Sequence, residues 1–217
     1  MNKKEIIEKV CEQVNPEHIK FLLWHGTRPG RDIDLLIVLK KKTEVRLCES
    51  SKSKLDILMI DNSEFIRRLK LLDPAITDPL ITGFVLLGNK KEIGSLRGNT
   101  ILSLSELKKV PKETIRFLKK KACKKLQNAN TLLQKNGNDS FYTFLVELSW
   151  ACGYYVFADY YDNSPVWITF DHLLVINKHI VFKRVMAALE VVKSGESFDR
   201  SRMINLFKEA QKMLRVA

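Results

Sequence analysis

The sequence lacks any apolar run long enough to cross a membrane. A transmembrane helix needs about 18 or more consecutive apolar residues, and no stretch of this chain approaches that length. The first eight residues follow the pattern of an amphipathic helix and not that of a signal peptide. We therefore expect a soluble, cytoplasmic protein without a membrane partner.

Paired cysteines and repeats are missing as well. The four cysteines, Cys11, Cys48, Cys123 and Cys152, include no C-x-x-C pair, which argues against a zinc site and against a disulfide framework. The chain has no internal repeat and no low-complexity tract. We expect reduced thiols with structural roles.

What the chain does contain is apolar residues and positive charge. With 217 residues, of which 45% are hydrophobic, it has room for one large or two small domains with a real core. The formal net charge is +12; residues 103–217 carry 19 Lys and Arg against 11 Asp and Glu, whereas residues 1–102 carry 18 against 14. This bias is compatible with RNA, DNA or an acidic protein as a partner, and equally with a solvated, lysine-rich surface.

Two carboxylates separated by one residue stand at the head of an apolar run. Asp32 and Asp34 precede the run 35–39, and on a strand two such side chains point to the same face, about 6 to 7 Å apart. Both can therefore reach one pocket, where a hard cation such as Mg²⁺ would take carboxylate oxygens and keep positions open for phosphates and water. The pattern predicts a metal and nucleotide site.

A third acid, Asp56, lies inside the short apolar run 55–60. Burying a carboxylate there is costly unless something pairs with it, and a metal held by a neighbouring strand would be such a partner. We expect residues 33–39 and 55–60 to pair as an antiparallel hairpin that brings Asp56 beside Asp32 and Asp34.

These residues carry a resemblance to a known family. Gly26-Thr27, followed by Asp32-Ile33-Asp34 and then Asp56, resembles the active-site signature of nucleotidyltransferases of the DNA polymerase β superfamily, and is most similar to the small kanamycin nucleotidyltransferase-like and minimal members. The resemblance covers roughly residues 18–90. Two features depart from the family pattern: Thr27 stands where serine is usual, and the linker 28–31 is shorter than in many relatives.

The resemblance implies a metal-dependent transfer of NMP from an NTP, ATP among them, to an acceptor hydroxyl with release of pyrophosphate. Two Mg²⁺ ions would be held by the catalytic acids Asp32, Asp34 and Asp56. The nucleotide would be bound by Gly26, Thr27, Arg28 and Arg31, because a shortened linker loses helix-terminus contacts to phosphate and the two arginines supply charge in their place.

Periodicity and turn residues predict the elements of both halves of the chain. The first half is expected to contain a helix at 2–14, strands at 18–25, 33–39, 55–60 and 83–87, and helices at about 63–72 and 75–82. The second half is expected to contain four helices, from Ser105 or Pro111 to about Gln134, at 139–162, within 170–194 with a break near Asn177, and from about 197 to 216.

The expected fold class is α+β. A small nucleotidyltransferase α/β domain with a mixed sheet would occupy residues 1–100, and an antiparallel helical bundle for acceptor binding or dimerisation would occupy residues 101–217. We place the boundary in the polar, turn-forming residues 90–103.

Four features of the chain keep two interpretations each. The aromatic helix 139–162 is either the buried centre of the bundle or a platform for base stacking, and Glu147 within it is either salt-bridged to a lysine of the preceding helix or a base for the acceptor. His25 either contacts a phosphate or packs beside Trp24. The lysines of 119–125, with Arg116, either follow a nucleic-acid backbone or form a solubilising surface.

Two functions from different classes therefore remain. The favoured one is the nucleotidyltransferase; the alternative is a catalytically weak module of the same fold that binds RNA or a partner protein through its basic helical half. The acceptor is open among a small molecule, RNA and protein, and a homodimer is also left open. His172 and His179 lack an arginine four to six residues before them, which disfavours a helical ribonuclease.

Overall fold

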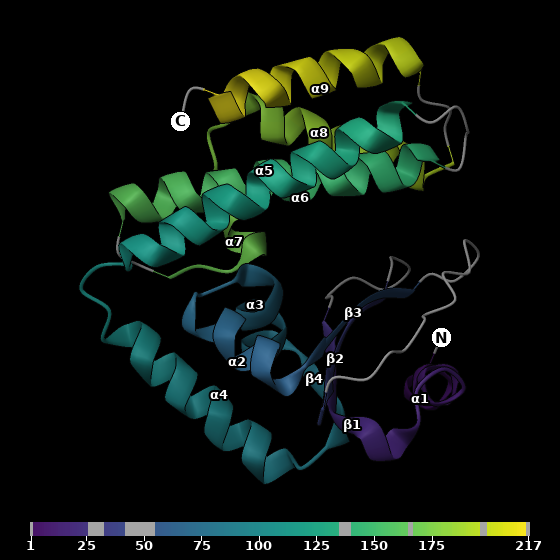
Figure 1. The fold of residues 1–217 in the computed structure, drawn as a ribbon, viewed down its shortest axis with the longest axis vertical. Helices are drawn as coiled ribbons and strands as arrows, with labels where there is room; N and C mark the ends of the chain where they lie inside the picture. Colours follow the sequence, from purple (N-terminus) through teal and green to yellow (C-terminus); the bar gives the residue numbers. More distant parts are fainter. Residues whose placement is uncertain are drawn as a thin grey trace. The chain divides into compact units, whose positions relative to one another are not determined.

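The computed structural model describes residues 2–25, 33–41, 55–134, 140–164, 167–195 and 199–215 (Figure 1). The chain divides into two compact units, Met1–Glu106 and Leu107–Ala217. The first contains a mixed sheet with helices and the second is helical, which confirms the predicted α+β class. Within the described ranges, no helix combines the length and the apolar character that a membrane crossing requires.

A four-stranded sheet forms the centre of the first unit. Its strands are ordered β3-β2-β1-β4, with β1 antiparallel to both of its neighbours and β2 parallel to β3. In chain order the elements are α1 (Lys3–Cys11), a 3₁₀ turn (Pro16–His18), β1 (Ile19–His25), β2 (Ile33–Leu39), β3 (Leu55–Asp61), α2 (Asn62–Lys70), α3 (Pro74–Thr82), β4 (Phe84–Gly88) and α4 (Lys90–Ser105).

Both faces of the sheet are covered by helices, which explains the nearly continuous apolar sequence of β2. One face packs Ile33, Leu35 and Ile37 against Ile6 and Val10 of α1. The other face packs the intervening positions of β2 against α2, α3 and α4, through Leu36, Val38, Phe65, Ile76, Leu80 and Ile93. Two separate cores therefore fix which face each strand residue occupies.

The expected antiparallel pairing of 33–39 with 55–60 is wrong, because β2 and β3 run parallel. A parallel pair needs a crossover of about a dozen residues or more, whereas a hairpin needs two to five. The 15 residues between Leu39 and Leu55 match the first requirement and exceed the second. The direction has a consequence for the site, since a parallel pair brings the amino-terminal ends of both strands to the same end of the sheet.

Capping side chains fix the start and end of α2 and α3. Asp61 begins α2 by accepting hydrogen bonds from the backbone N–H groups of Ser63 and Glu64 at 2.8 and 2.9 Å. Asp73 caps α3, where Pro74 follows at the first helical position. The end of α3 is held by Arg97 of α4, whose guanidinium donates to the carbonyl oxygens of Leu80 and Gly83, both at 2.7 Å.

Residues 90–103, expected to be a polar connection, form most of α4 instead. The Asn89 side chain begins this helix by accepting from the N–H of Lys91 at 3.0 Å. Ile93, Thr100 and Leu104 are its buried residues, and Ile93 docks on the core of the sheet. The glycines and polar residues of this segment suggested a turn, but the apolar positions have helical spacing.

The second unit consists, in its described residues, of α5 (Lys112–Gln134), α6 (Ser140–Asn163), α7 (Phe170–Ile176), α8 (Ile180–Lys193) and α9 (Arg200–Arg215). The segment predicted as one helix within 170–194 is two, with the break where it was expected. Asn177 adopts an extended conformation after α7, and its side-chain oxygen accepts from the N–H of His179 at 2.7 Å. That local bond starts the turn into α8.

The aromatic helix α6 is the buried centre of this unit, which confirms the core interpretation. Tyr154, Phe157 and Tyr161 are 2%, 0% and 2% exposed. The ring of Phe170 in α7 lies 5.5 Å from that of Trp150, and it also contacts Phe157 and Phe182. A helix that is apolar nearly all round is buried on all sides, and these rings are therefore core and not an exposed stacking platform.

We expect Gly153→Ala in α6 to lower the free energy of unfolding by about 1–2 kcal/mol. An added Cβ would lie 2.8 Å from Cε2 of the packed Phe170 ring, and overpacking of about 1–3 kcal/mol exceeds the gain of about 1 kcal/mol in helix propensity. Gly94→Ala in α4, where nothing lies within 4 Å of the new atom, is the matched control and should stabilise by about 0.5–1 kcal/mol. Urea unfolding measures both, and a stabilised Gly153→Ala variant would contradict the packing.

The thiols differ in reactivity because they differ in burial. Burial raises the pKa of Cys152 to about 12, whereas Cys123 is exposed on α5. Since the thiolate is the reactive form, we expect iodoacetamide at pH 8 to modify Cys123 in the folded protein and to modify Cys152 only after denaturation. Peptide mass spectrometry measures the extent of modification at each cysteine. Equal rates of modification at Cys123 and Cys152 in the folded protein would show that Cys152 is not buried.

Candidate active site

Three residues with catalytic chemistry form one row across the sheet. The Cα partner of His25 in β1 is Asp34 in β2, and the Cα partner of Asp34 in β3 is Asp56. Neighbouring strands lie about 4.8 Å apart, so the row extends over about 10 Å. His25 ends β1, while Asp34 and Asp56 are each the second residue of a strand. The row therefore lies at one end of the sheet.

Strand alternation assigns the row to one face of the sheet. Residues 21 and 23 of β1, 36 and 38 of β2, and 58 and 60 of β3 all belong to the core under α2 and α3. Successive strand residues point to opposite faces, so positions 25, 34 and 56 share that face. The apolar core stops before this end of the sheet, and the Asp34 side chain is half-buried. A polar rim thus borders the core.

Thr82, the last residue of α3, holds His25 from the helical layer. The Thr82 hydroxyl donates to the carbonyl oxygen of Asp78 at 2.9 Å and lies 3.0 Å from Nδ1 of His25. In this second bond either the Thr82 hydroxyl or His25 Nδ1–H donates, according to the tautomer of His25. Of the two interpretations of His25, packing beside Trp24 is not favoured, because Trp24 belongs to the opposite face.

Thr82 was not predicted from the sequence as a site residue. Its only sequence signal is its place beside Gly83, at the end of a helix that returns to the sheet. That glycine has a steric role, because a Cβ there would lie 2.3 Å from the carbonyl oxygen of Pro79. A Cβ there would also lie 3.0 Å from the carbonyl oxygen of Trp24, so the glycine lets the end of α3 approach β1.

Several predicted site residues lie outside the described residues. These are Gly26, Thr27, Arg28, Arg31 and Asp32, together with the side chain of Asp56. The described side chains contain no group of three His, Cys, Asp or Glu that could hold a metal ion. Because Asp32 and the side chain of Asp56 lie outside the described side chains, the predicted trio of acids stays a prediction.

The donors that the row offers suit a hard divalent cation. Mg²⁺ prefers carboxylate oxygens and keeps several waters or phosphate oxygens, and Asp34 and Asp56 are register neighbours on one face. No cysteine belongs to the row, so its chemistry does not favour a soft metal. If a metal binds here, Asp34 and Asp56 are the described positions that would hold it.

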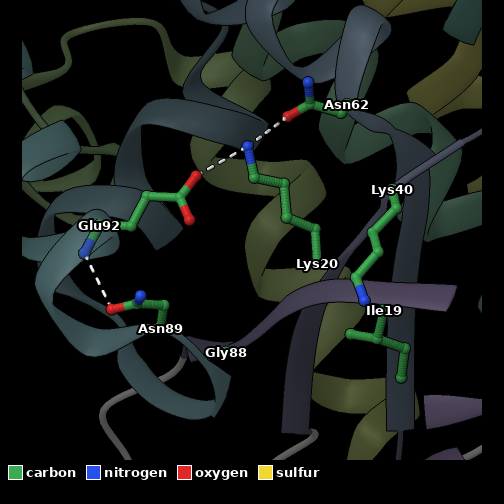
Figure 2. A pocket seen from close by; sticks show the side chains of 7 residues that line it. All are labelled: Ile19, Lys20, Lys40, Asn62, Gly88, Asn89 and Glu92. Carbon is green, nitrogen blue, oxygen red and sulfur yellow. Dashed lines mark hydrogen bonds and ion pairs between the residues drawn. The ribbon is translucent and has the colours of Figure 1, made fainter. Parts of the chain in front are cut away.

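A pocket of about 570 Å³ occupies the opposite end of the same unit (Figure 2). It is lined by residues where β1 begins and where β2, β3 and β4 end: Ile19, Lys20, Lys40, Asn62, Gly88, Asn89 and Glu92. His25 lies five residues after Lys20 in β1, which is about 16 Å along a strand. None of the predicted site residues lines this pocket, so it is not the candidate active site.

The charges inside this pocket largely compensate one another. Lys20 Nζ lies 2.9 Å from Oε1 of Glu92 and 3.1 Å from Oδ1 of Asn62 (Figure 2). Asn89 uses its side chain to begin α4. The pocket therefore has a paired lysine in its wall and not a concentrated field for an anion.

Of the two interpretations of Glu147, the structure supports the salt bridge to a lysine of the preceding helix. Its carboxylate accepts from Lys125 Nζ at 2.5 Å and from the Asn128 amide at 2.8 Å, both from the preceding helix α5. The pair is partly buried between α5 and α6. The salt-bridge interpretation is confirmed.

Comparisons with known proteins give a distant likeness in structure alone. No family model matches the sequence, and no curated protein matches it. Among solved structures, a nucleotidyltransferase-like protein from Exiguobacterium sibiricum 255-15 matches 97% of this chain and 75% of its own, with a TM-score of 0.38 and 10% sequence identity. At that similarity the match carries no inference about activity, which must rest on the residues of this chain.

Proposed function

We propose that this protein is a metal-dependent nucleotidyltransferase that moves NMP from an NTP to an acceptor hydroxyl and releases pyrophosphate. The observation that carries the proposal is the register of β2 and β3, which makes Asp34 and Asp56 neighbours on one face at one end of the sheet. Asp32 precedes Asp34 by two residues, and Gly26-Thr27 directly follows His25. The proposal thus assigns all three acids and the glycine pair to this end of the sheet.

The apolar surroundings support a functional role for the acids. Neighbouring carboxylates repel each other, and placing them beside a buried core costs more than placing them in water. Asp34 lies one pleat from Leu36, which is 1% exposed. Two acids in register at this position would suit a cation site.

Bound Mg²⁺ would neutralise triphosphate charge and lower the pKa of the acceptor hydroxyl. In the proposal Asp32, Asp34 and Asp56 supply the carboxylate oxygens that hold it. Gly26 lets the backbone approach the nucleotide, and the turn amides with Thr27 donate to phosphate oxygens.

Positive charge completes the nucleotide side of the proposed site. Arg28 and Arg31 balance the charge of the leaving pyrophosphate. His25, whose Nδ1 lies 3.0 Å from the Thr82 hydroxyl, donates to a phosphate from its other ring nitrogen when protonated. The residues thus act mainly by positioning and by electrostatics.

Incubation with each α-³²P-labelled NTP and Mg²⁺ tests the proposal. Pyrophosphate release should accompany label on one acceptor among total RNA, protein and added aminoglycosides, and Asp32→Ala and Asp34→Ala should abolish both. The acceptor is identified by the fraction that carries the label. Turnover that persists in both variants, or no NTP turnover with any acceptor fraction, would overturn the proposal.

A further inference from the structure

Helix α5 in the second unit carries an unusual excess of positive charge. Its 23 residues include seven Lys and Arg and a single acid, Glu113. Its apolar residues are used inside the unit, where Ile115, Leu118, Ala122 and Ala129 are buried. The charge is therefore concentrated on the remaining surface of the helix.

Four of these cations form a regular exposed row, which we call the α5 row: Lys112, Arg116, Lys120 and Lys124. They are four residues apart, and all four side chains are exposed. At 1.5 Å per residue each step is about 6 Å along the helix, and the row is about 18 Å long. Residues four apart are neighbours on the helix surface and differ by about 40° around its axis, so the row is a strip that turns by about 120° from Lys112 to Lys124.

The α5 row is not neutralised by neighbouring acids. Within the described residues none of its four members forms an ion pair. Other cations of the helix have structural roles: Lys125 pairs with Glu147, and Lys121 Nζ lies 5.5 Å from the centre of the Phe117 ring. A row of like charges destabilises a helix slightly, so the row has a cost in stability and no compensating contact.

Helix α9, which packs beside α5, adds to the positive field. Its sixteen residues contain five Lys and Arg and one acid, Glu209. Glu209 is already paired with Arg184 of α8 at 2.6 Å. Arg200 at the start of α9 donates to the carbonyl oxygen of Leu133 in α5 at 3.3 Å, which ties the two helices together.

We propose that the α5 row binds the phosphodiester backbone of a nucleic acid. One strand of a duplex carries a phosphate about every 3.4 Å along its axis, so a row of about 18 Å faces about five phosphates. A membrane surface fits less well, because a helix that lies on lipid needs exposed apolar side chains. None of the large apolar side chains that are exposed in the described residues lies on α5.

Charge reversal within the row tests this proposal. The variant Lys120→Glu/Lys124→Glu is compared with Lys178→Glu/Lys183→Glu, which reverses two exposed lysines near and on α8 and lowers the formal net charge from +12 to +8 in the same way. Fluorescence anisotropy with a 20-nucleotide RNA, and with DNA of the same sequence, measures affinity at 50–200 mM KCl. Circular dichroism on both variants monitors folding.

We expect the row variant to bind at least about tenfold more weakly and the α8 control to change by less than about twofold. For a single strand each lost phosphate contact should reduce the slope of log affinity against log salt by about 0.7, so the row variant should lose about 1.4. Whether RNA or DNA binds more tightly identifies the polymer. Equal losses in both variants, absence of wild-type binding at 50 mM KCl, or binding only to phosphatidylserine vesicles would overturn the proposal.

This binding does not depend on nucleotidyl transfer. It should persist without Mg²⁺ and NTP, and in the Asp34→Ala variant. Loss of binding in Asp34→Ala, with retained folding, would overturn the assignment to α5.

Discussion

Asp34→Asn is expected to reduce nucleotidyl transfer by about 10³-fold or more while leaving the protein folded. Asparagine keeps the shape of the side chain at the centre of the His25–Asp34–Asp56 row and removes its charge. Metal-assisted charge stabilisation is worth several kcal/mol, and each 1.36 kcal/mol is a factor of ten in rate. Rates of pyrophosphate release at saturating NTP and Mg²⁺ measure the effect.

A binding measurement separates this role from a general loss of activity. Ligands that bind only the folded state raise its stability, by about 2.7 kcal/mol at one hundred times the dissociation constant. Mg²⁺ with a nonhydrolysable NTP should therefore raise the melting temperature of the wild type and not that of Asp34→Asn. Asp162→Asn, an exposed aspartate at the end of α6, is the control and should behave as the wild type. If the melting temperature of Asp34→Asn rises as much as that of the wild type, Asp34 does not take part in binding Mg²⁺ and NTP.

Arg68→Leu is expected to lower the free energy of unfolding by about 3–5 kcal/mol. Arg68 Nε lies 2.7 Å from Oδ2 of Asp73, and the two side chains are 6% and 0% exposed. Removing one partner of a buried ion pair leaves the other charge in a poorly solvated place. Asp73 also caps α3, the helix that carries Thr82, so the loss should loosen the support of His25.

The neighbouring arginine provides a matched control. Arg67, on the same helix, pairs with Glu64 at 2.7 Å, but its side chain is 53% exposed. Arg67→Leu should cost about 1 kcal/mol or less, since exposed pairs are weak. Urea unfolding of both variants measures the difference. If Arg67→Leu and Arg68→Leu lower the free energy of unfolding equally, burial does not determine how much an ion pair contributes to stability.

Strand and helix positions in the first unit were predictable because local patterns there agree with the tertiary packing. The strand at 33–39 and the helices expected at about 63–72 and 75–82 correspond to β2, α2 and α3 of the structure. Helix α4 was missed because Gly94 and Gly98 hid its apolar spacing. Both glycines are exposed, so they weaken the helix without interrupting its packing.

The acids themselves were visible in the sequence, but their neighbours were not. A D-x-D pattern before an apolar run, with a third acid in the next run, needs no structure to be noticed. The contact of Thr82 with His25 joins residues 57 positions apart, and only the return of α3 to the sheet brings it about. The partner of Glu147 could be anticipated as a lysine of the preceding helix, because helices joined by a short loop pack together.

The sequence by itself determined the class of fold, the identity of the candidate acids and the basic character of the second half, because these follow from periodicity and composition. The length of the connection permits a parallel pair, but only the tertiary structure showed that β3 runs parallel to β2 and that Asp34 and Asp56 are neighbours. An antiparallel partner would have paired the amino-terminal end of one strand with the carboxyl-terminal end of the other. The direction of a strand depends on the path of the chain between strands. Side-chain alternation indicates only which face of the sheet a residue occupies.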